Sequence, residues 1–400
     1  MKKNILSICF LFLASAMMAE NLPENQTENP QEIKDENPSE EKNAFSQWWK
    51  NLAHGNIDRT HERPFDLSFV FSPFYSQEGG FGIGGQASAL YRLDRKDSID
   101  QPSDFTLMGG VSFKGIYGVG LRGNINLPDH KSRISYKAHF QHKRRDFWGI
   151  TYDDCNARAA NNDQGRTEYK VQALRLETEF KRKFAGQWYW GVNVNLLYQS
   201  AKLDSVHYMM GQSLKGFFSG YGGSIQYDSR DYILNAKRGI FARAGLMFYP
   251  SALGQNDHTV WRTSLQFDTY VPVWKGGILA FDAYGQFNAS SDGEVPWQLR
   301  EEICLDETRM RGYYQGCYTD NHQLAVQAEL RQHLFWRIGA VTWVGTGIIF
   351  HEFEKIRKDM WLPNGGVGIR FELKHNTNAR IDLGFGRHNM GVAFNFAEAF

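Results

Sequence analysis

The sequence predicts an all-β fold, a transmembrane antiparallel β-barrel of about sixteen strands. Apolar and polar residues alternate in segments of roughly ten residues along much of the chain, as expected where a strand shows one face to lipid and the other to a lumen. Aromatic residues make up 14% of the chain and 39 residues are glycines, which suits aromatic girdles and tight turns. After residue 19, no apolar run approaches the roughly 18 residues that a membrane helix needs.

The first 19 residues have the layout of a cleavable secretory signal. Lys2 and Lys3 precede an apolar run from residue 5 to residue 19 that ends in small residues. Residues 20–63 are rich in Asp and Glu and poor in apolar residues, so we expect an acidic disordered linker there. The predicted barrel then occupies residues 64–400. The signal indicates export, and the barrel together with the signal indicates the outer membrane of a Gram-negative bacterium.

The number of strands follows from the length of the barrel segment. A membrane strand with its turn or loop takes roughly twenty residues, so residues 64–400 have room for about seventeen strands. Bacterial single-chain barrels favour even numbers, and we therefore expect sixteen strands, with fourteen as the alternative. No length remains for a second folded domain.

Within the barrel the alternation is clearest at residues 134–140, 261–271, 324–330, 367–373 and 390–400. In the last segment, Val392, Phe394, Phe396 and Phe400 share one side of an extended stretch that ends on an aromatic residue. We interpret this stretch as the C-terminal strand signal of an outer-membrane barrel. A soluble β-sandwich also alternates, but its strands are shorter and its outward face is polar.

Charge and motifs argue against several other classes of protein. The formal net charge is +1 with no basic run, so nucleic-acid binding is not expected. The sequence has no Gly-x-Ser-x-Gly motif, and His351 with Glu352 lacks the second histidine of a zinc helix. We therefore expect no enzymatic activity, no cofactor and no metal site. The alternative is a barrel-embedded lipase whose Ser-His pair is assembled across strands.

Several ordered motifs resemble those of a known family. Residues 311–316, Arg-Gly-Tyr-Tyr-Gln-Gly, followed by Tyr-Thr-Asp at 318–320, resemble the lumen-loop signature of the BamA/TamA-type outer-membrane barrels, also called the bacterial surface antigen family. Further segments are similar to the first hairpin, a mid-barrel strand and the C-terminal strand pair of that family: residues 72–85, 222–230, 378–386 and 398–400. The resemblance spans nearly the whole predicted barrel.

The resemblance implies that the sixth external loop folds back into the barrel. Its tip would be Arg311, Gly312 and Tyr313, and Glu329 would be the partner of Arg311. A partly desolvated guanidinium needs a carboxylate, and a bidentate pair fixes both the distance and the orientation of the loop. Glycine lets the backbone turn sharply at the tip.

The chain departs from the family pattern in the strand that usually carries an aromatic-x-Asp-x-Gly motif. Residues 343–347 read Trp-Val-Gly-Thr-Gly, without the aspartate. Three alternatives stay open: Glu372 or Asp382 takes its place, the loop is held more loosely, or these two carboxylates are ordinary solvated lumen charges. The linker is also too short for a POTRA domain, the periplasmic module of members that insert other proteins, so the chain resembles the short members without POTRA domains.

The cysteines suggest one restraint on the predicted loop. Cys304 and Cys317 lie on either side of Arg311 in the sequence, and a disulfide between them would close a short ring beside the tip, provided that the geometry allows it. Cys155 lies in a polar stretch and is expected to be an external thiol.

Three functional hypotheses follow. In the first, the barrel acts in or alongside outer-membrane protein assembly or export, through a weak seam between the strand at residues 65–76 and the strand at 390–400; Gly384, Gly386 and Gly391 would weaken that seam. In the second, it is a passive pore or a structural subunit of an envelope complex, with the loop as a plug. The third is the embedded lipase. The partners expected are outer-membrane lipids including lipopolysaccharide, client outer-membrane proteins, and periplasmic or lipoprotein assembly factors.

Overall fold

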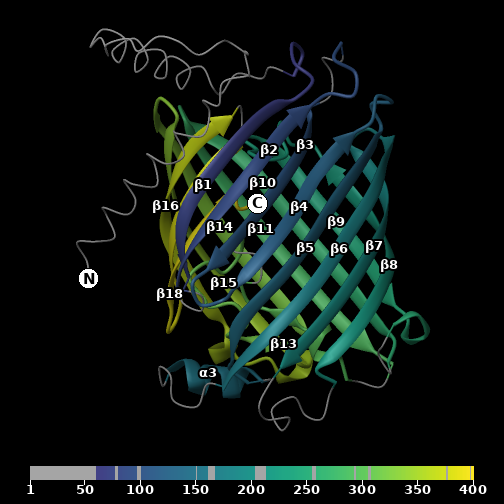
Figure 1. Cartoon of the computed structure of the whole chain (residues 1–400), viewed down its shortest axis with the longest axis vertical. Helices are drawn as coiled ribbons and strands as arrows, with labels where there is room; N and C mark the ends of the chain where they lie inside the picture. Colours follow the sequence, from purple (N-terminus) through teal and green to yellow (C-terminus); the bar gives the residue numbers. More distant parts are fainter. Residues whose placement is uncertain are drawn as a thin grey trace, which may run out of the picture.

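Sixteen antiparallel strands form one continuous sheet in the computed structural model, and each strand pairs with its neighbours in chain order. Figure 1 shows the strands tilted and wrapped around a central space. The structure describes residues 60–76, 80–96, 101–149, 151–160, 167–202, 213–254, 258–291, 294–304, 308–374, 377–396 and 398–400. The predicted signal peptide and all but the last residues of the predicted linker lie outside these ranges. The predicted number of sixteen strands is confirmed.

The wall of the sheet is made of long strands joined by connections of two kinds. Its strands are β1 Asp66–Ser76, β2 Gly80–Tyr91, β3 Ser103–Ser112, β4 Tyr117–Asn126, β5 Ser132–Phe147, β6 Thr167–Ala185, β7 Trp188–Lys202, β8 Lys215–Asp228, β9 Gly239–Tyr249, β10 Val260–Trp274, β11 Gly277–Ser290, β14 His322–Phe335, β15 Ile338–Phe350, β16 Leu362–Lys374, β17 Thr377–Phe385 and β18 Met390–Phe396. A small separate sheet pairs β12 Glu301–Glu302 with β13 Thr319–Asp320. Helix α3 is Tyr152–Ala160, and 3-10 turns lie at Ser251–Leu253, Trp297–Leu299, Phe353–Lys355 and Lys358–Met360.

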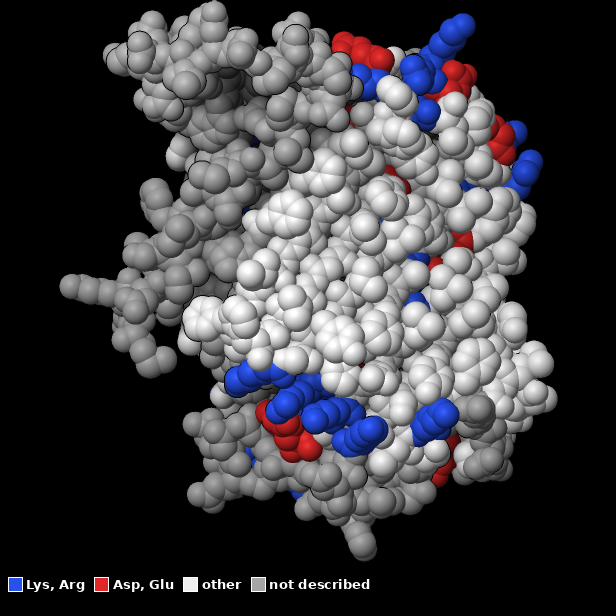
Figure 2. Space-filling model, in the orientation of Figure 1, with Lys and Arg blue, Asp and Glu red and all other residues white. Residues whose placement is uncertain are grey.

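The distribution of side chains across the wall is the reverse of that in a soluble protein. On β7, Trp190, Val192 and Val194 point outward and are exposed, whereas the alternate residues Asn193 and Gln199 are buried inside. Figure 2 shows the outcome on the described part of the visible face, a broad band that is mostly free of charged side chains. This pattern suits a sheet surrounded by lipid, and it excludes the soluble β-sandwich.

The two ends of the sheet differ in the length of their connections. At one end, β6 and β7, β10 and β11, and β14 and β15 are joined by only two residues each. At the other end, the connections hold α3, the β12–β13 pair and all four 3-10 turns. Short turns are typical of the periplasmic end of an outer-membrane barrel and long loops of its external end. We therefore take the end with α3 as external.

A hydrophobic cluster occupies the external half of the interior. It joins α3, the connection between β11 and β14, and the inward faces of β14 to β16. Tyr318 is fully buried there, with its ring stacked on Tyr152 at a centroid distance of 5.8 Å and edge-on to Tyr313 at 5.9 Å. The connection between β11 and β14 therefore packs inside the sheet.

The end of the chain corrects one prediction. Strand β18 ends at Phe396, and residues 398–400 leave the wall, with the backbone NH of Glu398 donating to the carbonyl of Leu234. Val392 is exposed on the outer surface, but the ring of Phe400 lies inside, 6.3 Å from the ring of Tyr270. The prediction that Phe400 shares a side with Val392 is wrong; the side chains of Phe394 and Phe396 lie outside the described part of the structure.

Candidate functional site

The predicted loop tip lies against the inner wall, where strand alternation gathers charged residues. Glu329 and Arg331 are two residues apart on β14, as are Arg380 and Asp382 on β17, so each pair points to the same side of the sheet. All four side chains are buried. A charge buried in this way needs a partner, because leaving one unpaired costs several kcal/mol.

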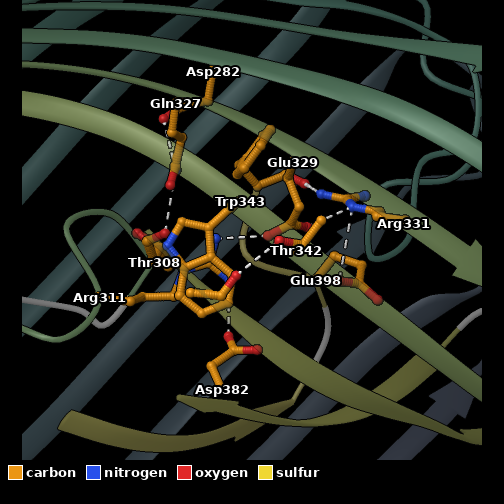
Figure 3. A network of polar contacts seen from close by, with 12 residues as sticks. Asp282, Thr308, Arg311, Gln327, Glu329, Arg331, Thr342, Trp343, Asp382 and Glu398 are labelled. Carbon is orange, nitrogen blue, oxygen red and sulfur yellow. Dashed lines mark hydrogen bonds and ion pairs between the residues drawn. The ribbon is translucent and has the colours of Figure 1, made fainter. Parts of the chain in front are cut away.

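Arg311 meets two of these carboxylates. Its Nη2 donates to Glu329 Oε2 at 2.6 Å, and its Nη1 donates to Asp382 Oδ2 at 2.9 Å. The guanidinium also lies 3.7 Å from the centre of the Trp343 ring, a cation–π contact, and only 1% of the residue is exposed. Figure 3 shows Arg311 and Trp343 side by side between Glu329 and Asp382. Asp382 therefore supplies a second carboxylate where residues 343–347 lack the aspartate of the motif.

The pairs continue beyond Arg311 and close on themselves. Glu329 Oε1 accepts from Arg331 Nε at 2.8 Å, and Arg331 Nε lies 3.9 Å from Glu398 Oε2. Glu398 Oε2 accepts from Arg370 Nε at 2.8 Å, and Arg370 Nη1 donates to Asp382 Oδ1 at 2.6 Å, which returns to Arg311. We call this set the ion-pair ring; its members are Arg311, Glu329, Arg331, Glu398, Arg370 and Asp382. Charges of opposite sign alternate around it.

The ion-pair ring joins parts of the chain that are far apart in sequence. Arg311 comes from the loop, Glu329 and Arg331 from β14, Arg370 from β16, Asp382 from β17 and Glu398 from the end of the chain. Arg380 donates to Asp382 Oδ2 at 3.1 Å, and Arg331 also donates to the main-chain oxygen of Phe400 at 2.9 Å. The loop and the C-terminal residues are thus held by one network.

The two neighbours of Arg311 at the tip need space rather than charge. Gly312 has φ +106°, and a Cβ there would lie 2.4 Å from the carbonyl carbon of Gly384. The ring of Tyr313 covers Gly386, where an added Cβ would lie 2.5 Å from it, and its hydroxyl donates to the carbonyl of Pro363 at 2.7 Å. Burial raises the pKa of Tyr313 to about 12. Gly384 and Gly386 thus make room for the tip. The sequence predicts that these glycines weaken the seam but does not indicate this role.

Other contacts hold the loop on further sides of the lumen. Arg309 forms a bidentate pair with Asp282 on β11, at 2.6 and 2.7 Å. Across the interior, Arg145 on β5 donates to Glu302 at 2.8 Å. Burial raises the pKa of Glu302, but Arg145 outweighs this effect and holds it below its usual value. The loop therefore spans the lumen from β5 to β17.

The remaining predicted residues are placed as follows. Glu372 lies on β16 two residues beyond Arg370, and the carboxylates that Arg311 contacts within the described residues are those of Glu329 and Asp382. Cys155 is a free thiol on α3, at the end taken as external, but it is fully buried rather than exposed to solvent; burial raises its pKa to about 12. Cys304 and Cys317 are buried thiols of the same hydrophobic cluster. The disulfide is not formed in this structure and stays a prediction.

Sequence reasoning missed several members of the site: Arg309, Arg331, Trp343, Arg370, Arg380 and Glu398. The sequence feature that could have identified some of them is a pair of opposite charges two residues apart within an otherwise apolar strand, as in Glu329 with Arg331. Among the described residues, no group of three or more His, Cys, Asp or Glu side chains is arranged to hold a metal ion. No helix within the described ranges is long and apolar enough to cross a membrane.

Solved structures of known proteins have a similar architecture. BamA from Haemophilus ducreyi lacking POTRA domains 1-3 is similar in structure, with a TM-score of 0.51 and 11% identity over 82% of this chain and 69% of that one. CdiB from Acinetobacter baumannii and CdiB from Escherichia coli also give a TM-score of 0.51, each at 12% identity. They cover 82% and 84% of this chain, which spans 59% and 62% of theirs. At such identities the likeness concerns the fold.

No curated protein matches the sequence. Residues 119–345, from β4 into β15, match the model of the Omp85 superfamily domain. This match covers more than half of the chain, and it agrees with the resemblance to the BamA/TamA-type barrels. The chain belongs to the Omp85 superfamily.

Proposed function

We propose that this chain acts in outer-membrane protein assembly or export, through the seam between β1 and β18. The observation that carries the proposal is the departure of the C-terminal residues from the wall. β18 pairs with β17 over seven residues, whereas β1 pairs with β2 over eleven. Glu398 and Phe400 are held inside by Arg370 and Arg331 rather than extending β18.

A short edge strand leaves backbone groups of the other edge without partners. Among the described residues, pairing is recorded on only one side of β1 and on only one side of β18. Unpaired backbone groups are costly in lipid, and a client strand that pairs with them removes that cost. The seam is therefore a place where strand addition is favourable.

Locking the seam tests the proposal. Cysteines at Phe69 and Phe394, on β1 and β18, allow crosslinking in cells that hold the variant as their sole copy. We expect the outer-membrane protein profile to change when the crosslink forms and to recover after reduction, while each single-cysteine variant behaves as the wild type. A confirmed crosslink with an unchanged profile would exclude a gate at the seam.

The second candidate is a passive pore, or a structural subunit, in which the loop is a plug. It is favoured by the loop contacts on opposite sides of the lumen, Arg145 with Glu302 on one side and Arg311 with Asp382 on the other. Removal of residues 305–320 should then raise conductance in planar bilayers. Equal conductance of the deletion variant and the wild type would rule out the plug.

A further inference from the structure

The outward face of the wall carries a row of basic residues at its external end. Arg144 on β5 is directly opposite Lys170 on β6, and Lys170 is directly opposite Lys202 on β7. Directly opposed residues have Cβ atoms about 5 Å apart, and like charges in such positions repel each other. Within the described residues, neither lysine has a carboxylate partner in an ion pair. Lys170 and Lys202 therefore place two positive charges side by side that the described part of the wall does not neutralise.

The row faces the surroundings rather than the lumen. The residues that alternate with it, Arg145, Tyr169 and Ala201, are buried inside. Toward the middle of the membrane, Leu174 and Leu176 on the same face of β6 are exposed apolar residues. Lys170 is four residues from Leu174, a rise of about 13 Å along the strand. This spacing puts the row just outside the apolar band, at the level of lipid headgroups.

A fourth cation extends the row, and two acids lie beyond it. Lys215 on β8 is exposed, and its Nζ lies 5.9 Å from the centre of the ring of Tyr198. Arg144 pairs with Glu168 at 3.1 Å in a solvent-accessible position, and Asp146 is directly opposite Glu168. Figure 2 shows basic side chains in a row below the mostly uncharged band, with acidic side chains beneath them. The cations thus lie nearer to the bilayer than the acids do.

We propose that this row binds the phosphate groups of lipopolysaccharide in the outer leaflet. A lipid of the membrane can contact the row with its headgroup and cover Leu174 and Leu176 with its acyl chains at the same time. Phosphate oxygens accept strong charge-assisted hydrogen bonds from Lys and Arg, and a phosphate between opposed cations removes their repulsion. The proposal is independent of the seam, because the row lies on β5 to β8.

Native mass spectrometry of the purified full chain in detergent tests the proposal, with lipid A as the probe. The variant Lys170→Gln/Lys202→Gln removes two charges from exposed positions, so we expect it to keep the fold. The matched control is Lys131→Gln/Arg182→Gln, which removes two charges at the opposite end of β5 and β6. We expect the first variant to bind lipid A roughly tenfold or more weakly than the wild type, and the control to bind it unchanged.

Lipid A without its phosphate groups separates headgroup binding from acyl-chain binding. We expect the wild type to bind this lipid as weakly as the Lys170→Gln/Lys202→Gln variant binds lipid A. The proposal is overturned if the variant keeps wild-type affinity, if the control loses as much, or if removal of the phosphates has no effect. Heat-modifiability on gels verifies that each variant is folded.

Discussion

The replacement Glu398→Gln isolates the contribution of the C-terminal residues to the ion-pair ring. Glu398 accepts from Arg370 at 2.8 Å and from Asn378 at 2.6 Å, and its side chain is only 3% exposed. Removing one partner of a buried ion pair costs ~3–5 kcal/mol. Since Arg331 and Arg370 keep Glu329 and Asp382 as partners, we expect the lower end, about 3 kcal/mol. Glutamine has nearly the same shape, so packing contributes little to this difference.

Denaturant unfolding in detergent, followed by tryptophan fluorescence, measures the loss. The matched control is Glu352→Gln, which removes an exposed carboxylate paired with Lys355; we expect no measurable shift, because exposed pairs add little. If Glu398→Gln unfolds at the same denaturant concentration as the wild type, the ion-pair ring does not hold the end of the chain.

A double-mutant cycle with Arg311→Gln asks whether the loop and the C-terminal residues are coupled. Arg311 and Glu398 share the neighbours Glu329 with Arg331 on one side and Asp382 with Arg370 on the other. Independent sites add to within about 0.5 kcal/mol, and we expect a larger interaction energy here. Additive losses would refute transmission around the ring.

Four further outcomes are expected. Arg311→Ala should lower the folded yield seen by heat-modifiability, because it removes the cation that Glu329 and Asp382 share, at a cost of ~3–5 kcal/mol; an unchanged yield contradicts this. Gly312→Ala should release the loop to added protease, since its Cβ would lie 2.4 Å from Gly384; wild-type resistance argues against the close approach. Because the pKa of Glu302 lies below its unfolded value of 4.5, the ionised carboxylate stabilises the fold above pH 4.5, and this stabilisation is lost as the pH falls through the lowered pKa. Acid should therefore make the loop of the wild type more accessible to pepsin. The Glu302→Gln variant has no carboxylate to protonate at this position, so the accessibility of its loop should change less. Deleting Phe400 should impair barrel insertion, and normal surface levels would count against a C-terminal signal.

The wall of the barrel was predictable because a strand between lipid and a lumen must alternate along its whole length. The number of strands followed from length, and the contact of Arg311 with Glu329 followed from the family resemblance. The second carboxylate stayed open at the sequence level because Glu372 and Asp382 both lie on inward faces of neighbouring strands. The register decides between them, and register is set by strand pairing that spacing alone does not define.

The end of the chain was mispredicted for a reason that the sequence contains. Val392, Glu398 and Phe400 all lie at alternate positions, so a strand that continued to Phe400 would turn the carboxylate of Glu398 toward lipid. Such a placement is costly, and an intramembrane acid normally faces inward. The apolar alternation identified the strand but not its last residue. Burial of Cys155 was missed because it depends on the position of α3 against Tyr318, a contact between distant segments.

The loop between β11 and β14 also links distant strands of the wall to one another. Its described contacts reach β5 through Glu302, β11 through Arg309, and β14 and β17 through Arg311. The strands that the loop connects should move least relative to one another. Strands β1 to β4 lie between the seam and β5, the first strand that the loop contacts, so we expect them to move together about β5 while the opposite wall stays rigid. Hydrogen exchange should therefore be faster in β1 to β4 than in β14 to β17.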